Sequence, residues 1–327
     1  MSSVIGRKRI RTPGCQAGAA PPLSCATAPA ELRHRQRQGA SGMDQRIIDL
    51  YDEYTHAPLP RRVFLERLAG LAGSAAAIPA ILAAIEPNYA RAAIVGEDDT
   101  RLAAEDVSFQ GATGDVTGYL ARPKLMDKAP AVLVIHENRG LNAYVKDVTR
   151  RLATEGFVAM APDLLSPLGG TPQDADKARD MIGQLDTDKT VNNLIAGMSY
   201  LMAYRYSSAK VGAVGFCWGG GMINRLAIKA PDLKAGVAFY GPTPDPALVG
   251  TVKSPLLLHY AGLDQRVNAG IPAYDEALKK AGVEHQIYMY EGVNHAFHND
   301  TSAERYNKEA ADLAWKRTVE FLKAKLA

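Results

Sequence analysis

Short apolar runs alternate with helical stretches from about residue 105 onward. The run 131–135 reads AVLVI, which is typical of a strand that is buried on both faces of a sheet. Strands are predicted at 107–109, 117–121, 131–135, 157–161, 210–216, 235–240, 256–260 and 286–290. Helices are predicted at 145–155, across 174–204, and at 219–229, 273–281 and 303–324. This order predicts an α/β fold with a mostly parallel sheet and helices on both faces.

The first two predicted strands are expected to form an antiparallel pair that opens the domain. The later strands are expected to run mostly parallel, because apolar strands alternate with helical stretches along this part of the chain. Open sheets of this kind bind ligands at the carboxyl ends of their strands. The chemistry should therefore lie in the loops that follow residues 135, 216, 260 and 290.

The amino-terminal part has a different pattern. A helical arrangement of apolar and aromatic residues begins at Met43, and residues 68–85 contain no charged side chain. The pair Arg61-Arg62 precedes that apolar run, and Ala90-Arg91-Ala92 follows it, as in an export signal with a small-residue cleavage site. The segment resembles a twin-arginine signal across 61–92, although Pro60 and Glu66 depart from the usual pattern. A helix that stays on the protein is the alternative, and a membrane anchor is marginal in length.

Charge divides the chain unevenly. Residues 1–42 carry seven Lys and Arg residues and one acidic residue, whereas the net charge of the whole 327-residue chain is only +3. This small net charge argues against nucleic acid as the main partner. We expect a disordered basic leader over 1–42, a helical region over 43–104 and a catalytic domain over 105–327. A stable membrane anchor is not expected, and export to the periplasm is preferred to a cytoplasmic location.

A glycine-rich turn follows the predicted strand 210–216. It reads Gly215-Phe216-Cys217-Trp218-Gly219, which is the arrangement of a nucleophile elbow with cysteine in place of serine. Small residues two positions before and after Cys217 allow the strand and the following helix to approach closely. The helix amino terminus beside the sulfur favours the thiolate. The chain has only three cysteines, too few for a disulfide framework, and Cys217 is the single thiol outside the leader.

An acid and a histidine follow the next strands in the order expected of a catalytic triad. Asp264 comes directly after the strand 256–260, and His295 lies in the loop after 286–290. Each has a simpler alternative, a turn aspartate or a loop histidine, but their order and positions together favour a triad with Cys217. His295 and His298 form a His-x-x-His pair, which lacks a third ligand, so no metal is expected.

These motifs resemble the dienelactone hydrolase family, the carboxymethylenebutenolidases, over residues 105–325. The resemblance rests on the elbow, the Gly-Leu-Asp turn at Asp264, the Gly-Val-Asn-His-Ala-Phe loop at His295, and His136-Glu137-Asn138-Arg139-Gly140. It implies an alpha/beta hydrolase fold. It also implies that Glu137 holds the resting thiol until substrate displaces it, and that the backbone N–H groups of Asn138 and Trp218 form an oxyanion hole.

The substrate contacts of the family carry over less well. The resemblance implies two arginines and a serine that hold a substrate carboxylate. This chain has Asn299 and Ala296 at two of those positions and Ala175 at the third, with Lys177 and Arg179 nearby. Arg139 is a candidate substitute.

The predicted activity is hydrolysis of a small ester or lactone through a thioester on Cys217, without a cofactor. A thiol-dependent acyltransferase on the same scaffold and a non-catalytic thiol protein for redox sensing or binding remain alternatives. Detection of acyl transfer in preference to hydrolysis would identify the first, and a stoichiometric burst without turnover the second.

Amino-terminal sequencing tests the export prediction. In protein made by a bacterium with twin-arginine export, we expect the mature chain to begin near Ala93, because cleavage follows the small-residue site. Cytoplasmic protein that still carries Met1 or Met43 would count against export.

Overall fold

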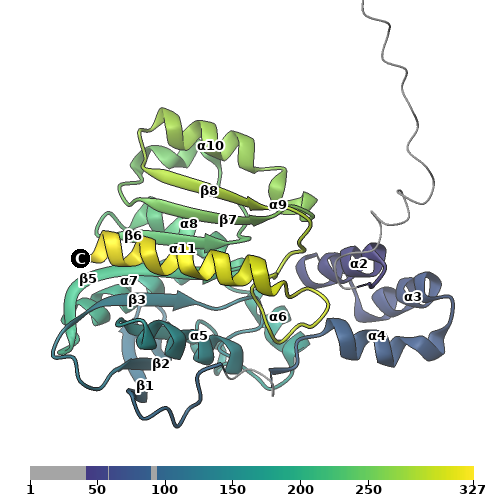
Figure 1. Cartoon of the computed structure of the whole chain (residues 1–327), viewed down its shortest axis with the longest axis horizontal. Helices are drawn as coiled ribbons and strands as arrows, with labels where there is room; N and C mark the ends of the chain where they lie inside the picture. The colour runs from purple at the N-terminus through teal and green to yellow at the C-terminus, as the bar shows by residue number, and fades with distance from the viewer. Residues whose placement is uncertain (1–41, 58, 90–93) are drawn as a thin grey trace, which may run out of the picture. The chain divides into compact units, whose positions relative to one another are not determined.

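The computed structural model describes residues 42–57, 59–89 and 94–327. One sheet of eight strands organises the chain from residue 102 onward, in the order β1-β2-β4-β3-β5-β6-β7-β8 (Figure 1). The strands are β1 (Leu102–Gly111), β2 (Gly114–Pro123), β3 (Ala129–Ile135), β4 (Val158–Pro162), β5 (Ser207–Phe216), β6 (Ala235–Phe239), β7 (Leu256–Ala261) and β8 (His285–Tyr290). β2 pairs antiparallel with both β1 and β4, and the remaining pairs are parallel.

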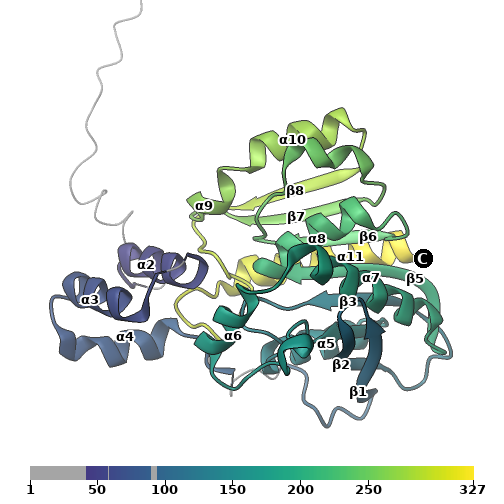
Figure 2. The same cartoon turned by 180° about the vertical axis from the view of Figure 1, so that it is seen from behind.

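Helices cover both faces of this sheet (Figures 1 and 2). One apolar core lies beneath α5 (Ala143–Thr154) and α11 (Lys308–Leu326), and the other beneath α7 (Thr187–Ala203), α8 (Trp218–Lys229) and α10 (Ile271–Lys280). The central strands are apolar throughout because both of their faces are buried, as in β3, β5 and β6. The predicted α/β fold with a mostly parallel sheet is confirmed.

The last helix begins later than the sequence predicts. α11 begins after Asn307, whose side chain accepts the backbone N–H of Ala310, and not at 303. The residues before it form a loop held by polar side chains. Asn299 accepts from the backbone N–H and the hydroxyl of Thr301, and the Ser302 hydroxyl donates to the carbonyl of Ile85. Short polar side chains that bond the local backbone compete with the helix, so the apolar spacing alone misplaced its start.

The amino-terminal apolar run is broken into two helices. α3 (Arg61–Ala72) ends at Gly73, which has a φ of 72°, and α4 (Ile78–Ile85) follows a short 3-10 helix at Ala75–Ala77. The two helical arms are bent by 108°. Among the described residues no single helix is long and apolar enough to cross a membrane. The two arms of the bent pair, counted together, have the length and apolar composition of a membrane span, and nothing else supports that role. The leader expected over 1–42 lies outside the described residues, apart from Gly42.

The described residues 43–57 and 59–89 form a unit that we call the helical cap. It comprises α2 (Gln45–His56), α3 and α4, and it has its own apolar core. Tyr51, Tyr54 and Phe64 are fully buried there, and the rings of Tyr54 and Phe64 stack with centroids 4.3 Å apart. The aromatic positions of α2 that suggested a helix are therefore the positions that bind α2 to α3.

Hydrogen bonds and an ion pair join the helical cap to the catalytic domain. They include Gln45 Nε2 to Asn294 Oδ1 at 2.6 Å, Asn138 Nδ2 to the Thr55 carbonyl at 2.6 Å, and Arg179 Nη1 to the Tyr54 carbonyl at 3.2 Å. Arg61, the first arginine of the pair that resembles an export signal, forms an ion pair with Asp176. Cleavage near Ala93, which remains a prediction, would remove every one of these contacts.

Truncation of Phe64 should loosen the helical cap. Phe64→Ala removes a fully buried aromatic ring, a change that destabilises cores by about 3–5 kcal/mol. We expect the backbone amides of α2 to exchange hydrogen faster while those of β3 and β5 stay protected. Arg62→Ala is the matched control, since its side chain is 89% exposed on the same helix. Equal exchange in both variants would show that α2 does not depend on this core.

Candidate active site

The turn at Cys217 has the strained geometry of a nucleophile elbow. Cys217 adopts φ 56° and ψ −117° between β5 and α8. The flanking glycines leave no room for a side chain. A Cβ on Gly215 would lie 2.2 Å from the carbonyl oxygen of Gly219, and one on Gly219 would lie 2.4 Å from that of Ile135. The thiol is 5% exposed and lies at the amino terminus of α8, which favours a negative charge on sulfur.

Asp264 and His295 meet beside this turn. Asp264 follows β7, and its Oδ2 lies 2.5 Å from His295 Nδ1 while Oδ1 accepts the backbone N–H of Val267. Burial alone would lower the pKa of His295, but the charges of Cys217 and Asp264 oppose it and raise the pKa to about 10. Burial would raise the pKa of Asp264, yet His295 brings it below its usual value. His295 Nε2 is buried and has no hydrogen-bond partner among the described atoms.

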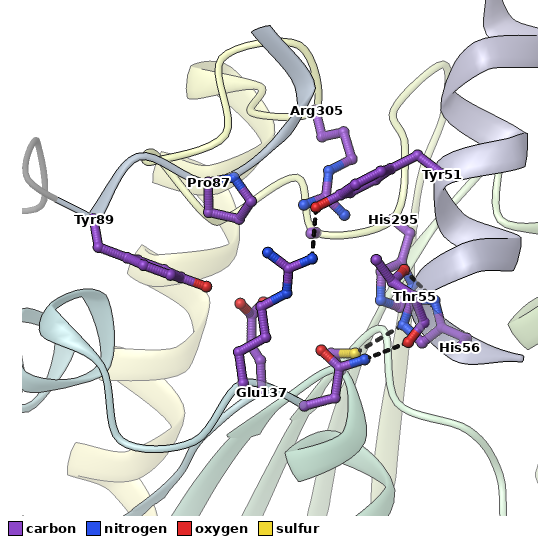
Figure 3. Close-up of a pocket in the computed structure, with 12 residues that line it drawn as sticks. Tyr51, Thr55, His56, Pro87, Tyr89, Glu137, His295 and Arg305 are labelled. Carbon is purple, nitrogen blue, oxygen red and sulfur yellow. Dashed lines mark hydrogen bonds between the residues drawn. The ribbon is translucent and has the colours of Figure 1, made fainter. Parts of the chain in front are cut away.

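A residue that the sequence analysis missed lies against the sulfur. His56, the last residue of α2, has its Nε2 3.0 Å from Cys217 Sγ (Figure 3). Its ring meets the His295 ring edge-on, with centroids 4.6 Å apart. Burial, followed by the positive charges of His295 and Arg266, holds the pKa of His56 well below its usual value. No spacing rule connects residues 161 positions apart, so only the docking of the helical cap reveals this contact.

The Glu137 carboxylate bonds other groups than the thiol in this structure. It accepts hydrogen bonds from Asn299 Nδ2 at 2.7 Å and from the Tyr240 hydroxyl at 3.4 Å. The Asn299 amide draws the carboxylate to the side, and His56 occupies the position at the sulfur. The role of Glu137 at the resting thiol, which the family resemblance implies, stays a prediction.

The two predicted oxyanion donors flank Cys217. Trp218 is the first residue of α8, where backbone N–H groups have no partner within the helix. Asn138 follows Glu137 in the loop after β3 and lines the same pocket as Cys217 and Trp218. The His136 ring stacks on Trp218 with centroids 5.4 Å apart, so it fixes the loop against the elbow. Their function as an oxyanion hole stays a prediction.

Cys217 opens on two spaces. A cavity of about 20 Å³, room for about one water, lies between the thiol and the helical cap. Arg139 and Arg305 line it, both 7% exposed, and Arg139 donates to the Tyr51 hydroxyl at 2.8 Å (Figure 3). A second pocket, of about 540 Å³, also reaches Cys217 and is lined by Trp218, Ile182, Arg179 and Arg266 among others.

The sulfur and the two imidazoles form a close group whose ligand atoms all lie within 4.8 Å of one another. The 3.0 Å separation of His56 Nε2 and Cys217 Sγ is that of a hydrogen bond. It is shorter than two ligands would show on one zinc ion at about 2.0 and 2.3 Å in a tetrahedral arrangement. We therefore assign these groups as hydrogen-bonding partners. His298 lies apart, bonded to the Tyr144 hydroxyl at 2.7 Å.

Comparisons with known proteins agree with this geometry. The profile of the Dienelactone hydrolase family matches residues 116–326. The chain belongs to the dienelactone hydrolase family. A "Putative carboxymethylenebutenolidase" of Saccharolobus solfataricus is 32% identical over 257 residues, which cover 67% of this chain and 98% of that protein. The "Putative hydrolase fragment YghX" of Escherichia coli is 47% identical over 105 residues, covering 31% of this chain and 90% of the fragment.

A solved structure shows the same fold. The crystal structure of a "Putative Dienelactone Hydrolase" from Klebsiella pneumoniae has a TM-score of 0.62 and 27% sequence identity, and the match covers 68% of this chain and 98% of that one. The chain is thus a carboxymethylenebutenolidase-like hydrolase of the alpha/beta hydrolase superfamily. The dienelactone hydrolase match leaves the helical cap outside its bounds. A separate profile, described as YqhI-like, matches residues 35–73.

The positions that hold a substrate carboxylate in the dienelactone hydrolase family are occupied differently here. Asn299 bonds Glu137, and Ala296 lines the small cavity next to His295. Ala175 begins α6 (Ala175–Ile182), while Arg179 on the same helix bonds Asp180 and lines the larger pocket. Arg305, like His56, was missed by the sequence analysis, because it lies in the loop that was expected to be helix.

Removal of the Asp264 charge should disable the site without unfolding it. Asp264→Asn keeps the shape but lowers the pKa of His295, so the imidazolium is lost at lower pH. We expect turnover to fall by roughly 10³–10⁴ near neutral pH. Asp275→Asn is the matched control, because Asp275 bonds His285 at 2.9 Å on the far side of the domain. A pH–rate profile that is the same in both variants would contradict a catalytic role for Asp264.

Proposed function

We propose that this protein hydrolyses small esters or lactones through a thioester on Cys217. The observation that carries the proposal is the strained Cys217 at the amino terminus of α8. Beside it, the His295 ring is held by Asp264, and its Nε2 has no hydrogen-bond partner among the described atoms. A nucleophile, a base and a residue that orients the base are the parts that acyl transfer requires.

In the first half-reaction, His295 Nε2 takes the thiol proton and the sulfur attacks the ester carbonyl. The C–S bond forms, and the carbonyl oxygen carries the negative charge next to the N–H groups of Asn138 and Trp218. Each such donor contributes about 3–4 kcal/mol to the transition state. The intermediate collapses with cleavage of the C–O bond, and the proton on His295 passes to the leaving alkoxide.

In the second half-reaction, His295 accepts a proton from water as the water oxygen attacks the thioester. The C–S bond breaks, the carboxylic acid is released, and the proton returns to sulfur. Asp264 stays ionised throughout and stabilises the imidazolium. Each step conserves atoms and charge with ester and water alone, so no cofactor is required.

The larger pocket is the proposed substrate site. A volume of about 540 Å³ suits a small molecule, whereas the small cavity beside Cys217 holds about one water. Trp218 and Ile182 supply apolar surface, and Arg266 supplies positive charge. Arg179 is paired with Asp180, which lines the pocket as well. We therefore favour a small acyl group with an anionic substituent. Arg139 faces the small cavity and remains a second candidate for that anion.

Replacement of the thiol tests the function directly. With a panel of small lactones, enol esters and aryl esters, Cys217→Ala should abolish turnover, because Cys217 is the only cysteine among the described residues. Cys217→Ser should keep weak esterase activity at best, since its alkoxide is much harder to generate. Mass spectrometry of a slow substrate should detect an acyl adduct on Cys217. Activity of Cys217→Ala within tenfold of wild type would overturn the proposal, and preferential transfer to alcohols would favour an acyltransferase.

A further inference from the structure

We propose that His56 holds the resting Cys217 thiol: its Nε2 accepts the S–H hydrogen bond and keeps the sulfur uncharged until substrate displaces the imidazole. The inference rests on the proposed function, in which Cys217 is the nucleophile. It assigns a catalytic residue to the helical cap, which lies outside the match to the dienelactone hydrolase family. The starting observation is the 3.0 Å contact between His56 Nε2 and Cys217 Sγ.

The tautomer of His56 follows from its other nitrogen. His56 Nδ1 lies 2.8 Å from the backbone carbonyl oxygen of Asp52, which can only accept a hydrogen bond. The hydrogen of the neutral ring is therefore on Nδ1, and Nε2 presents a lone pair to the sulfur. A thiol facing a lone pair donates its hydrogen. His295 Nε2 has no partner among the described atoms, which agrees with an S–H bond directed at His56.

The surroundings shift the pKa values of the two imidazoles in opposite directions. Burial and the positive charges of His295 and Arg266 hold the pKa of His56 well below its usual range, so His56 does not keep a proton. Burial lowers the pKa of His295, but once the sulfur is ionised the charges of Cys217 and Asp264 outweigh burial and raise that pKa to about 10, so His295 keeps the proton that it takes from the thiol. The groups that face this centre come from the helical cap and from the loops after β3, β6, β7 and β8. They are Asp52, Glu137, Tyr240, Asp264, Arg266, His295 and Arg305.

Substrate binding should reverse this arrangement. A lone pair that faces the sulfur stabilises S–H and disfavours a thiolate, so the His56 contact must break before attack. His56 lines the larger pocket together with Cys217, so a substrate that enters there meets the imidazole at the sulfur. When His56 yields, the S–H group turns to His295 Nε2, which takes the proton. The role first expected of Glu137 is thereby filled by a residue of the helical cap.

Alkylation of Cys217 by iodoacetamide tests the proposal. It is followed in the full-length chain over a range of pH and read by mass spectrometry on the peptide that contains Cys217, because Cys15 and Cys25 react as well. Loss of the acceptor makes ionisation of the sulfur easier, so the midpoint of the rate–pH curve should move to lower pH in His56→Gln and His56→Ala. A shift of one pH unit gives about a tenfold higher rate in mildly acidic solution. Wider access would instead multiply the rate equally at every pH, so the midpoint separates the two effects.

Two matched variants complete the experiment. Arg62→Ala, on the exposed face of the helical cap, should keep the wild-type midpoint. Glu137→Gln removes a buried charge near the sulfur but no hydrogen bond to it, because Glu137 bonds Asn299 and Tyr240, so its midpoint should move less than that of either His56 variant. Hydrogen exchange of α2 verifies that the helical cap stays seated in each His56 variant. An unchanged midpoint in both His56 variants, or a shift found only in Glu137→Gln, would overturn the assignment.

Failure of this inference is distinguishable from failure of the proposed function. Turnover by Cys217→Ala would contradict the assignment of Cys217 as the nucleophile. The alkylation midpoints would still show whether His56 holds the Cys217 thiol. If Cys217→Ala loses turnover but the midpoint is unchanged in both His56 variants, Cys217 remains the proposed nucleophile and His56 does not hold its thiol.

Discussion

The close approach of α8 to the strands at Gly219 determines where every reacting group lies. Because no Cβ separates Gly219 from the carbonyl oxygen of Ile135, the helix begins directly behind Cys217 and the loop after β3 lies against the elbow. The strained backbone at Cys217 is the consequence of this contact. The helix amino terminus, the Trp218 N–H and the sulfur are thereby arranged together, and the loops after β7 and β8 need only bring Asp264 and His295 to them.

The catalytic domain was predictable because its chemistry is local to strand ends. Each of Cys217, Asp264 and His295 directly follows a strand that its apolar run identifies, and parallel strands bring their carboxyl ends to one edge. The start of α11 was less predictable, since short polar side chains such as Thr301 and Ser302 support a loop where apolar spacing still suggests a helix. Local sequence rules therefore predicted the position of a side chain wherever that position depends on the backbone of a single helix or strand.

The contacts of the helical cap were not predictable for the opposite reason. His56 reaches Cys217, and Tyr51 reaches Arg139, only through the packing of one folded unit on another. Two arginines before an apolar run also have two physical explanations. In the folded chain Arg61 pairs with Asp176, and the apolar residues of α3 and α4 fill the core with Phe64. The same composition thus suits an export signal and a folded cap alike.

The small cavity beside the thiol gives the helical cap an electrostatic effect that reaches beyond direct contact. Arg139 and Arg305 are almost fully buried next to it, with Tyr51 of the helical cap against both guanidinium groups. Charges in such a water-poor space act on the sulfur with less screening than charges in solvent. Substitutions in α2 can therefore retune the local field while β1 to β8 remain unchanged. Proteins that share this α/β domain but carry different amino-terminal segments would then differ in the reactivity of the thiol. Their cysteine, aspartate and histidine would be the same, and the dielectric environment of the sulfur would differ.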